Sequence, residues 1–116
     1  MSSKEEIRPW GKYEILLDSD NCKVKRIIVS PHQRLSYQYH FKREEIWTIV
    51  SGEATITLEE DVFLASPGDI IKIPKKSKHR IANHSDEDII LIEVQLGTYF
   101  GEDDIVRLQD DYFREL

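Results

Sequence analysis

The sequence has little cysteine and comparatively little positive charge. A single cysteine, Cys22, among 116 residues excludes an intrachain disulfide and is typical of a reducing compartment. Lysine and arginine together number 16 against 22 aspartates and glutamates, which gives a formal net charge of −6. The one basic cluster, residues 75–78, is too small to follow a phosphate backbone, so we expect no nucleic-acid partner.

The sequence also lacks long apolar runs, linkers and repeats. No run approaches the roughly 20 residues that a membrane-spanning helix needs, and residues 1–6 are too polar for the core of a signal peptide. We therefore expect a cytoplasmic protein without a membrane partner. Because the composition has no break, the sequence predicts a single domain over residues 1–116.

What the sequence does contain is a dense series of β-rich segments with a period of two. They predict an all-β sandwich or barrel, because almost no stretch has helical periodicity. The tail over residues 103–115 is the one candidate for a short helix. The predicted strands, separated by turn residues, are 13–17, 22–29, 35–40, 46–50, 54–58, 62–65, 70–73, 79–82 and 89–96.

Four polar residues, Gln38, His40, Glu45 and His79, have a spacing that a small β-barrel can bring to one cation. Side chains two apart on a strand share a face, which places Gln38 with His40, whereas Glu45 and His79 come from neighbouring strands. Each residue alone has an ordinary structural interpretation. Together they predict a site for one divalent ion, Zn²⁺ before Mn²⁺, Fe²⁺, Co²⁺ or Ni²⁺. The alternative is a buried hydrogen-bonded network without metal.

Residues 34–41 form a predicted strand with one polar and one aromatic face. The polar face carries Arg34, Ser36, Gln38 and His40, and the other carries Leu35, Tyr37, Tyr39 and Phe41. If the ligand-bearing face points into the barrel, the interior is a ligand cavity rather than a packed core. The aromatic face is then covered either by a second sheet of the chain or by another subunit, which would make a homodimer.

These stretches resemble the two motifs of the cupin superfamily. Gln38, His40, Glu45 and Gly52 fit the first motif, and Gly68, Pro74, His79 and Asn83 fit the second. Within the cupins the chain resembles the type II phosphomannose isomerase domain, which usually forms the C-terminal part of a bifunctional mannose-1-phosphate guanylyltransferase. The segments that carry this resemblance are 8–14 (RPWGKYE), 23–27 (KVKRI), 34–40 (RLSYQYH), 43–47 (REEIW), 50–52 (VSG), 101–107 (GEDDIVR) and 110–112 (DDY).

The resemblance implies a cupin fold, a double-stranded β-helix or jelly-roll barrel, and a sugar-phosphate isomerase. The implied reaction interconverts mannose 6-phosphate and fructose 6-phosphate by proton transfer through an enediolate, with the metal polarising the carbonyl. Arg43 is the expected catalytic residue, and Glu44 is the expected base. The phosphate also needs cationic partners, for which the candidates are Arg34, Lys25, Arg80 and Arg107.

The chain departs from the family pattern at three positions near these motifs. Lys42 ends what is a His-rich triplet in the family, Ile46 replaces the His before Trp47, and Phe113 replaces a Gly. The chain has no Gly-rich nucleotide loop, which excludes guanylyltransferase activity for it. Two other functions remain open, namely another metal-dependent cupin enzyme such as an Fe²⁺ oxygenase, and a non-catalytic sugar-binding module.

Overall fold

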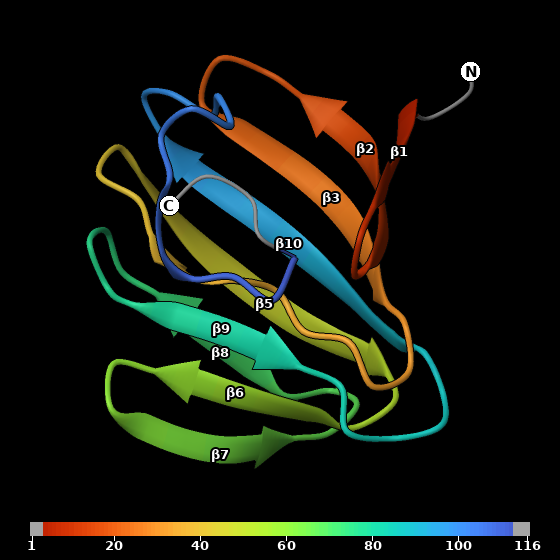
Figure 1. The fold of residues 1–116 in the computed structure, drawn as a ribbon. Helices are drawn as coiled ribbons and strands as arrows, with labels where there is room; N and C mark the ends of the chain where they lie inside the picture. Colours follow the sequence, from red (N-terminus) through yellow and green to blue (C-terminus); the bar gives the residue numbers. More distant parts are fainter. Residues whose placement is uncertain (1–3, 113–116) are drawn as a thin grey trace.

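The computed structural model describes residues 4–112, which form eleven β-strands in two antiparallel sheets (Figure 1). The first sheet has the order β1 (Lys4–Arg8), β2 (Gly11–Asp18), β3 (Cys22–Val29), β10 (Ile89–Gly97), β5 (Arg43–Ser51) and β8 (Ile70–Ile73). The second has the order β11 (Val106–Gln109), β4 (Tyr37–Tyr39), β9 (His79–Ala82), β6 (Ala54–Leu58) and β7 (Asp61–Ala65). No helix in the described residues is long and apolar enough to cross a membrane.

The inward faces of the central strands change from apolar to polar along their length. Strand β5 buries Arg43 and Glu45 near its start and then Trp47 and Ile49, because alternate residues of a strand point to the same side. Strand β10 runs antiparallel to it and buries Ile89 and Leu91 before Glu93 and Gln95. Leu91 pairs with Ile49 at the apolar end and Gln95 with Glu45 at the polar end, and Glu93 lies opposite Trp47 where the two ends meet. The barrel therefore has an apolar end and a polar end.

Strand β3 continues this arrangement on the other side of β10. Its buried residues are Lys25, Ile27 and Val29, and they lie opposite Glu93, Leu91 and Ile89 respectively. The hydrophobic core fills the apolar end and includes Trp47, Ile49, Ile56, Ile73, Ile81, Ile89 and Leu91. Burying these side chains supplies the main stabilisation of the fold, at about 1.5–3 kcal/mol for each large one.

The predicted polar interior of residues 34–41 is confirmed for three of its four members. Ser36, Gln38 and His40 are buried, and Tyr37 and Tyr39 between them are half-buried on the outward side of β4. Arg34 does not follow them, because it forms an isolated bridge with Ala82 before β4 begins.

The helix expected over residues 103–115 is wrong for the described part, residues 103–112; residues 113–115, with Phe113, lie outside the described residues. Residues 106–109 form β11, which pairs antiparallel with β4 and places Arg107 opposite Gln38. The edge of β4 offers unpaired backbone groups, and pairing with them outweighs the weak local preference of this acidic segment for a helix. Strand β1 was not predicted either.

Candidate metal centre

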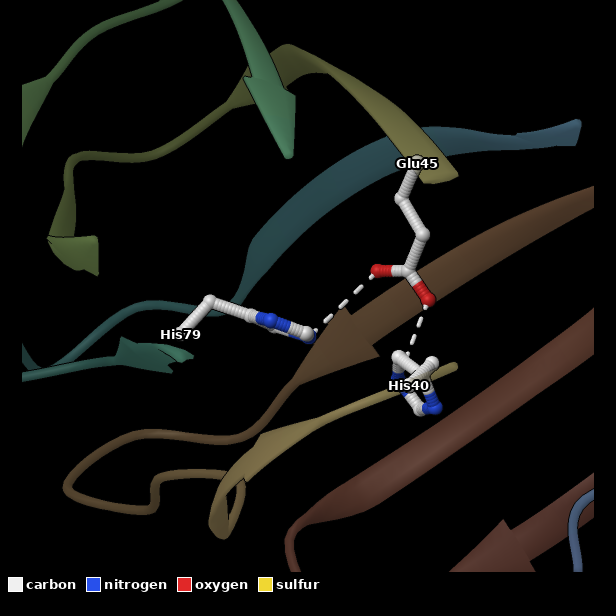
Figure 2. A group of neighbouring side chains, drawn as sticks. All are labelled: His40, Glu45 and His79. Atoms are coloured by element: carbon white, nitrogen blue, oxygen red, sulfur yellow. Dashed lines mark ion pairs between the residues drawn. The ribbon is translucent and has the colours of Figure 1, made fainter. Parts of the chain in front are cut away.

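The polar end of the barrel brings His40, Glu45 and His79 together. His40 follows β4, Glu45 lies near the start of β5, and His79 is the first residue of β9, so three strands position the group. All three side chains are buried, and their candidate ligand atoms lie within 4.8 Å of one another. Figure 2 shows the carboxylate between the two rings, with Glu45 Oε2 3.3 Å from His40 Nε2 and Oε1 3.6 Å from His79 Nε2.

Backbone carbonyls determine which nitrogen of each histidine carries the proton. His40 Nδ1 lies 2.6 Å from the carbonyl oxygen of Asp104, and His79 Nδ1 lies 2.8 Å from that of Ser77. A carbonyl can only accept a hydrogen bond, so each neutral ring donates from Nδ1 and presents the lone pair of Nε2 to Glu45. This orientation of imidazoles by outer hydrogen bonds is typical of metal-binding histidines.

The buried acceptors around the triad fit a cation. His79 Nε2 and Gln38 Oε1 are buried and have no hydrogen-bond partner among the described residues. Gln38 lies opposite His79 in the pairing of β4 with β9, so it belongs to the same region as the triad. Unpartnered buried acceptors are costly, and a divalent ion would satisfy them together with the Glu45 carboxylate. The residues present therefore fit the single metal ion that the sequence predicts.

Arg43 supplies the nearest protein cation. Its Nε donates to Glu45 Oε2 at 2.9 Å, its Nη2 lies 3.2 Å from His40 Nε2, and its Nη1 donates to Glu102 Oε2 at 3.2 Å. Burial would lower the pKa of the Arg43 guanidinium, but Glu45 and then Glu93 outweigh it and raise that pKa. Burial, and next the Arg43 charge, lower the pKa of His40 to about 4, so its ring is neutral near pH 7.

Glu93 is a second buried carboxyl beside Glu45. Trp47 Nε1 donates to both, at 3.1 Å to Glu45 Oε1 and 3.1 Å to Glu93 Oε2, and Gln95 Nε2 donates to Glu93 Oε1 at 2.6 Å. Burial, then the charge of Glu45, raise the pKa of Glu93. Burial acts the same way on Glu45, but the charge of Arg43 prevails and lowers the pKa of Glu45. Two adjacent buried carboxyls thus prefer different protonation states.

A cavity of about 60 Å³ lies beside this centre, large enough for several water-sized molecules. Its charged lining consists of Arg8, Lys25, Arg43, Arg107, Glu45, Glu93 and Glu102. Its other lining residues include Trp10, Tyr13, Ser36, Gln38 and Trp47. The mixture of cations, carboxylates and aromatic rings suits a small polar anion rather than an apolar ligand.

The structure brings only part of the predicted catalytic and phosphate-binding set to this cavity. Arg43, Lys25 and Arg107 line it. Arg34 instead forms a two-pronged ion pair with Asp111, at 2.6 and 2.9 Å. The other two members of the predicted set are Arg80 and Glu44.

Arg80 and Glu44 lie outside the lining of the cavity. Arg80 Nε donates to the Leu35 carbonyl at 2.8 Å, and its other nitrogens contact Gln109. Glu44 lies between two inward-facing residues of β5, so its side chain is on the opposite face of the strand. Its position therefore gives no support to the expected role as a base.

The sequence reasoning missed Arg8, Glu93, Glu102 and Asp104. Glu93 had a usable signal, because it and Gln95 stand at the inward-facing positions of a strand whose other residues up to Leu96 are aliphatic. Asp104 lies in the tail that was assigned to a helix, yet its carboxylate accepts hydrogen bonds from the backbone amides of Phe41 at 3.1 Å and Lys42 at 2.9 Å. With its carbonyl on His40, Asp104 holds the segment that carries this candidate ligand.

A barrel of two antiparallel sheets with a buried His/Glu/His group at its polar end is a cupin. In agreement, the chain superposes on a protein with a double-stranded β-helix domain from Klebsiella pneumoniae with a TM-score of 0.72 and 22% identity, covering 81% of this chain and 80% of that one. That likeness shows the fold. The chain belongs to the family described as Mannose-6-phosphate isomerase C-terminal, which matches residues 2–110 and confirms the resemblance seen in the motifs.

Relatives of known name are similar over nearly the whole chain. A mannose-1-phosphate guanylyltransferase of Salmonella muenchen is 43% identical over 105 residues, covering 90% of this chain and 22% of that protein. The alginate biosynthesis protein AlgA of Pseudomonas aeruginosa is 44% identical over 110 residues, covering 95% of this chain and 23% of that protein. The chain therefore spans less than a quarter of the length of these relatives.

Proposed function

We propose that this cupin domain is a metal-dependent isomerase that interconverts mannose 6-phosphate and fructose 6-phosphate. The observation that carries the proposal is the buried group of His40, Glu45 and His79, whose Nε2 atoms and carboxylate face one another beside a charged cavity that Glu45 lines. Membership of the mannose-6-phosphate isomerase family supports the choice of reaction. Gln38 is the proposed fourth ligand, and Zn²⁺ is the first choice for two imidazoles and a carboxylate.

A bound divalent ion would supply polarisation of the sugar carbonyl. The chain's own residues do the rest. Arg43 holds the Glu45 carboxylate in a fixed orientation from a buried position, and Lys25 and Arg107 provide positive charge for the phosphate. A group that moves a proton between the sugar carbons has to lie on the cavity wall, where the carboxyls other than Glu45 are Glu93 and Glu102.

A sugar-phosphate-binding module without catalysis is the second candidate, and Arg43 favours it. Its guanidinium already contacts both His40 Nε2 and Glu45 Oε2, so the charge of Glu45 is compensated without any metal. In that case the cavity would bind a sugar phosphate equally well in the presence of a chelator. The isomerase, in contrast, loses its activity when the ion is removed.

The experiment that separates the two candidates follows solvent deuterium. Purified protein is stripped with a chelator, reloaded with Zn²⁺, Mn²⁺, Fe²⁺, Co²⁺ or Ni²⁺, and incubated with mannose 6-phosphate in deuterated water. We expect deuterium at C2 of mannose 6-phosphate or C1 of fructose 6-phosphate in the loaded samples only. If every loaded sample binds the sugar phosphate but shows neither exchange nor isomerisation, the chain is a binding module.

A further inference from the structure

The Glu102 carboxylate bridges two buried cations at the cavity. Its Oε1 lies 3.6 Å from Lys25 Nζ, and its Oε2 accepts a hydrogen bond from Arg43 Nη1 at 3.2 Å. The side chains of Lys25 and Arg43 are only 4% and 6% exposed, whereas that of Glu102 is 48% exposed. A half-exposed carboxylate from a loop is therefore shared between two cations that belong to the barrel interior.

The two cations differ in what else holds them. Lys25 projects from β3, and its Nζ lies 4.1 Å from the centroid of the Tyr13 ring, which fixes it by a cation–π contact. Arg43 contacts Glu45 through Nε and His40 through Nη2, and its Nη1 contacts Glu102. An anion in the place of the Glu102 carboxylate would thus lie one guanidinium away from the triad. An ammonium and a guanidinium edge converging on one point make a binding site for a phosphate.

We propose that Lys25 and Arg43 form the phosphate-binding subsite of this cavity, and that Glu102 is an internal anion which the phosphate of a substrate displaces. The proposal deepens the proposed function and rests on it for the identity of the sugar. The phosphate site itself can be tested without any turnover.

The loop that carries Glu102 is built so that this side chain can leave while the loop stays. Residues 101–104 form a turn in which the Asp104 amide donates to the Gly101 carbonyl at 3.1 Å. Asp104 is buried and fixes the loop to the amides of Phe41 and Lys42. Water can reach the half-exposed carboxylate of Glu102, whereas a phosphate dianion brings more charge and more acceptor oxygens to the same two cations.

Glu102 competes with phosphate for Lys25 and Arg43 at every pH at which phosphate is a dianion. Burial would raise the pKa of its carboxyl, but Lys25 and then Arg43 prevail and lower that pKa to about 2. The carboxylate is therefore charged wherever a phosphate would be a dianion, and its removal has to strengthen phosphate binding rather than weaken it.

The test is calorimetric titration of the whole chain with inorganic phosphate at constant ionic strength. Glu102→Gln should bind phosphate about fivefold more tightly than the unaltered chain, because the competing carboxylate is gone. Lys25→Met should bind it at least about tenfold more weakly, and Lys25→Met/Glu102→Gln should remain weak. Asp103→Asn is the matched control, since it removes the same charge from the same loop at a residue whose carboxylate contacts Tyr99.

Any of three results would overturn the proposal. The first is that Glu102→Gln binds phosphate no more tightly than the unaltered chain does, and the second is that Lys25→Met binds it as tightly as the unaltered chain. The third is that Asp103→Asn strengthens phosphate binding as much as Glu102→Gln. Unphosphorylated mannose should be insensitive to Glu102→Gln, whereas mannose 6-phosphate should follow inorganic phosphate. If the chain is an active isomerase but its phosphate affinity does not change with Glu102→Gln, this inference fails and the proposed function stands. If the variants show the expected phosphate affinities but the chain exchanges no deuterium, this inference stands and the isomerase proposal fails.

Discussion

The four histidines of the chain differ in what their ring nitrogens contact. His40 and His79 donate Nδ1–H to backbone carbonyls and turn Nε2 toward Glu45 in the buried polar end of the barrel. His32 and His84 are exposed, and His32 pairs with a surface carboxylate. Only the first pair therefore has lone pairs that are both oriented and shielded from water, which is what a metal ligand needs.

Replacing His40 and His79 together by alanine should abolish stoichiometric metal binding. The unaltered chain should retain about one divalent ion per chain after dialysis, because two imidazoles and a carboxylate converge in a buried site. Elemental analysis by mass spectrometry measures the ion directly. The matched control, His32→Ala/His84→Ala, removes the same number of imidazoles from the surface and should keep the ion. Undiminished stoichiometry in the first variant would rule out the site.

Arg43→Ala should reduce turnover by about 10²–10³ while the metal stays bound, because the guanidinium is a positioned charge and not a ligand. Arg43→Lys keeps the charge but lacks the planar guanidinium that reaches Glu45, His40 and Glu102 at once. Its turnover should therefore lie between that of the unaltered chain and that of Arg43→Ala. Steady-state kinetics with metal content measured on the same samples checks both. Loss of the ion together with the activity would mean that Arg43 acts by holding the site together.

At the scale of the strands, the period-two pattern of the sequence was sufficient to predict every strand that has a buried face. Strands β3, β6, β8 and β9 begin and end where the sequence predicts. The two strands that it did not predict, β1 and β11, lie at the edges of their sheets, where backbone pairing with the neighbouring strand rather than a hydrophobic face decides the conformation. The triad was predictable from motif spacing. The ion pairs of Arg34 and the loop position of Glu102 were not, because they depend on contacts distant in sequence.

Gly97 ends β10 at a point where the neighbouring strand leaves no room for a side chain. Its φ is +153°, and a Cβ there would lie 2.3 Å from the Lys42 carbonyl oxygen and 3.1 Å from the Cα of Arg43. Gly97→Ala should therefore destabilise the fold by on the order of 3 kcal/mol. It should also displace Arg43, its register partner, and lower turnover.

Gly68 is the matched control for this prediction. It also has a positive φ, +95°, but a Cβ at this position would meet nothing within 4 Å. Gly68→Ala should cost about 1–2 kcal/mol, from backbone strain alone. Denaturant unfolding of the two variants separates backbone strain from steric clash. If both variants lose the same free energy of unfolding, the close approach of Gly97 to β5 does not contribute to stability.

At the scale of the molecule, the barrel divides its interior between stability and chemistry. The same three strands, β3, β10 and β5, bury aliphatic residues at one end and Lys25, Glu93, Gln95, Arg43 and Glu45 at the other. The packed end holds the strands in register, which keeps the geometry of the charged end. Metal binding should in turn stabilise the whole barrel, since the ligands come from three different segments.

The outward face of β4, with the residue that follows His40, carries a row of aromatic side chains, Tyr37, Tyr39 and Phe41. The rings of Tyr39 and Phe41 pack edge to face with centroids 5.3 Å apart, and the Tyr37 hydroxyl donates to the Glu59 carbonyl at 3.0 Å. Phe41 is 49% exposed. The inward face of β4 lines the cavity, so the chain's other sheet lies on that side and does not cover the aromatic row. A second copy of the chain is the cover that we expect.

We therefore predict a homodimer at micromolar concentration that uses this aromatic row. Sedimentation velocity should show the unaltered chain as a dimer and Tyr39→Lys/Phe41→Lys as a monomer, because two lysines on each side of a symmetric interface repel. Val62→Lys/Leu64→Lys is the matched control: both residues are exposed on β7, the edge strand at the other end of the same sheet. This variant should remain a dimer. A monomeric unaltered chain would contradict the prediction, and dissociation of the β7 variant alone would place the contact at the free edge of the sheet instead.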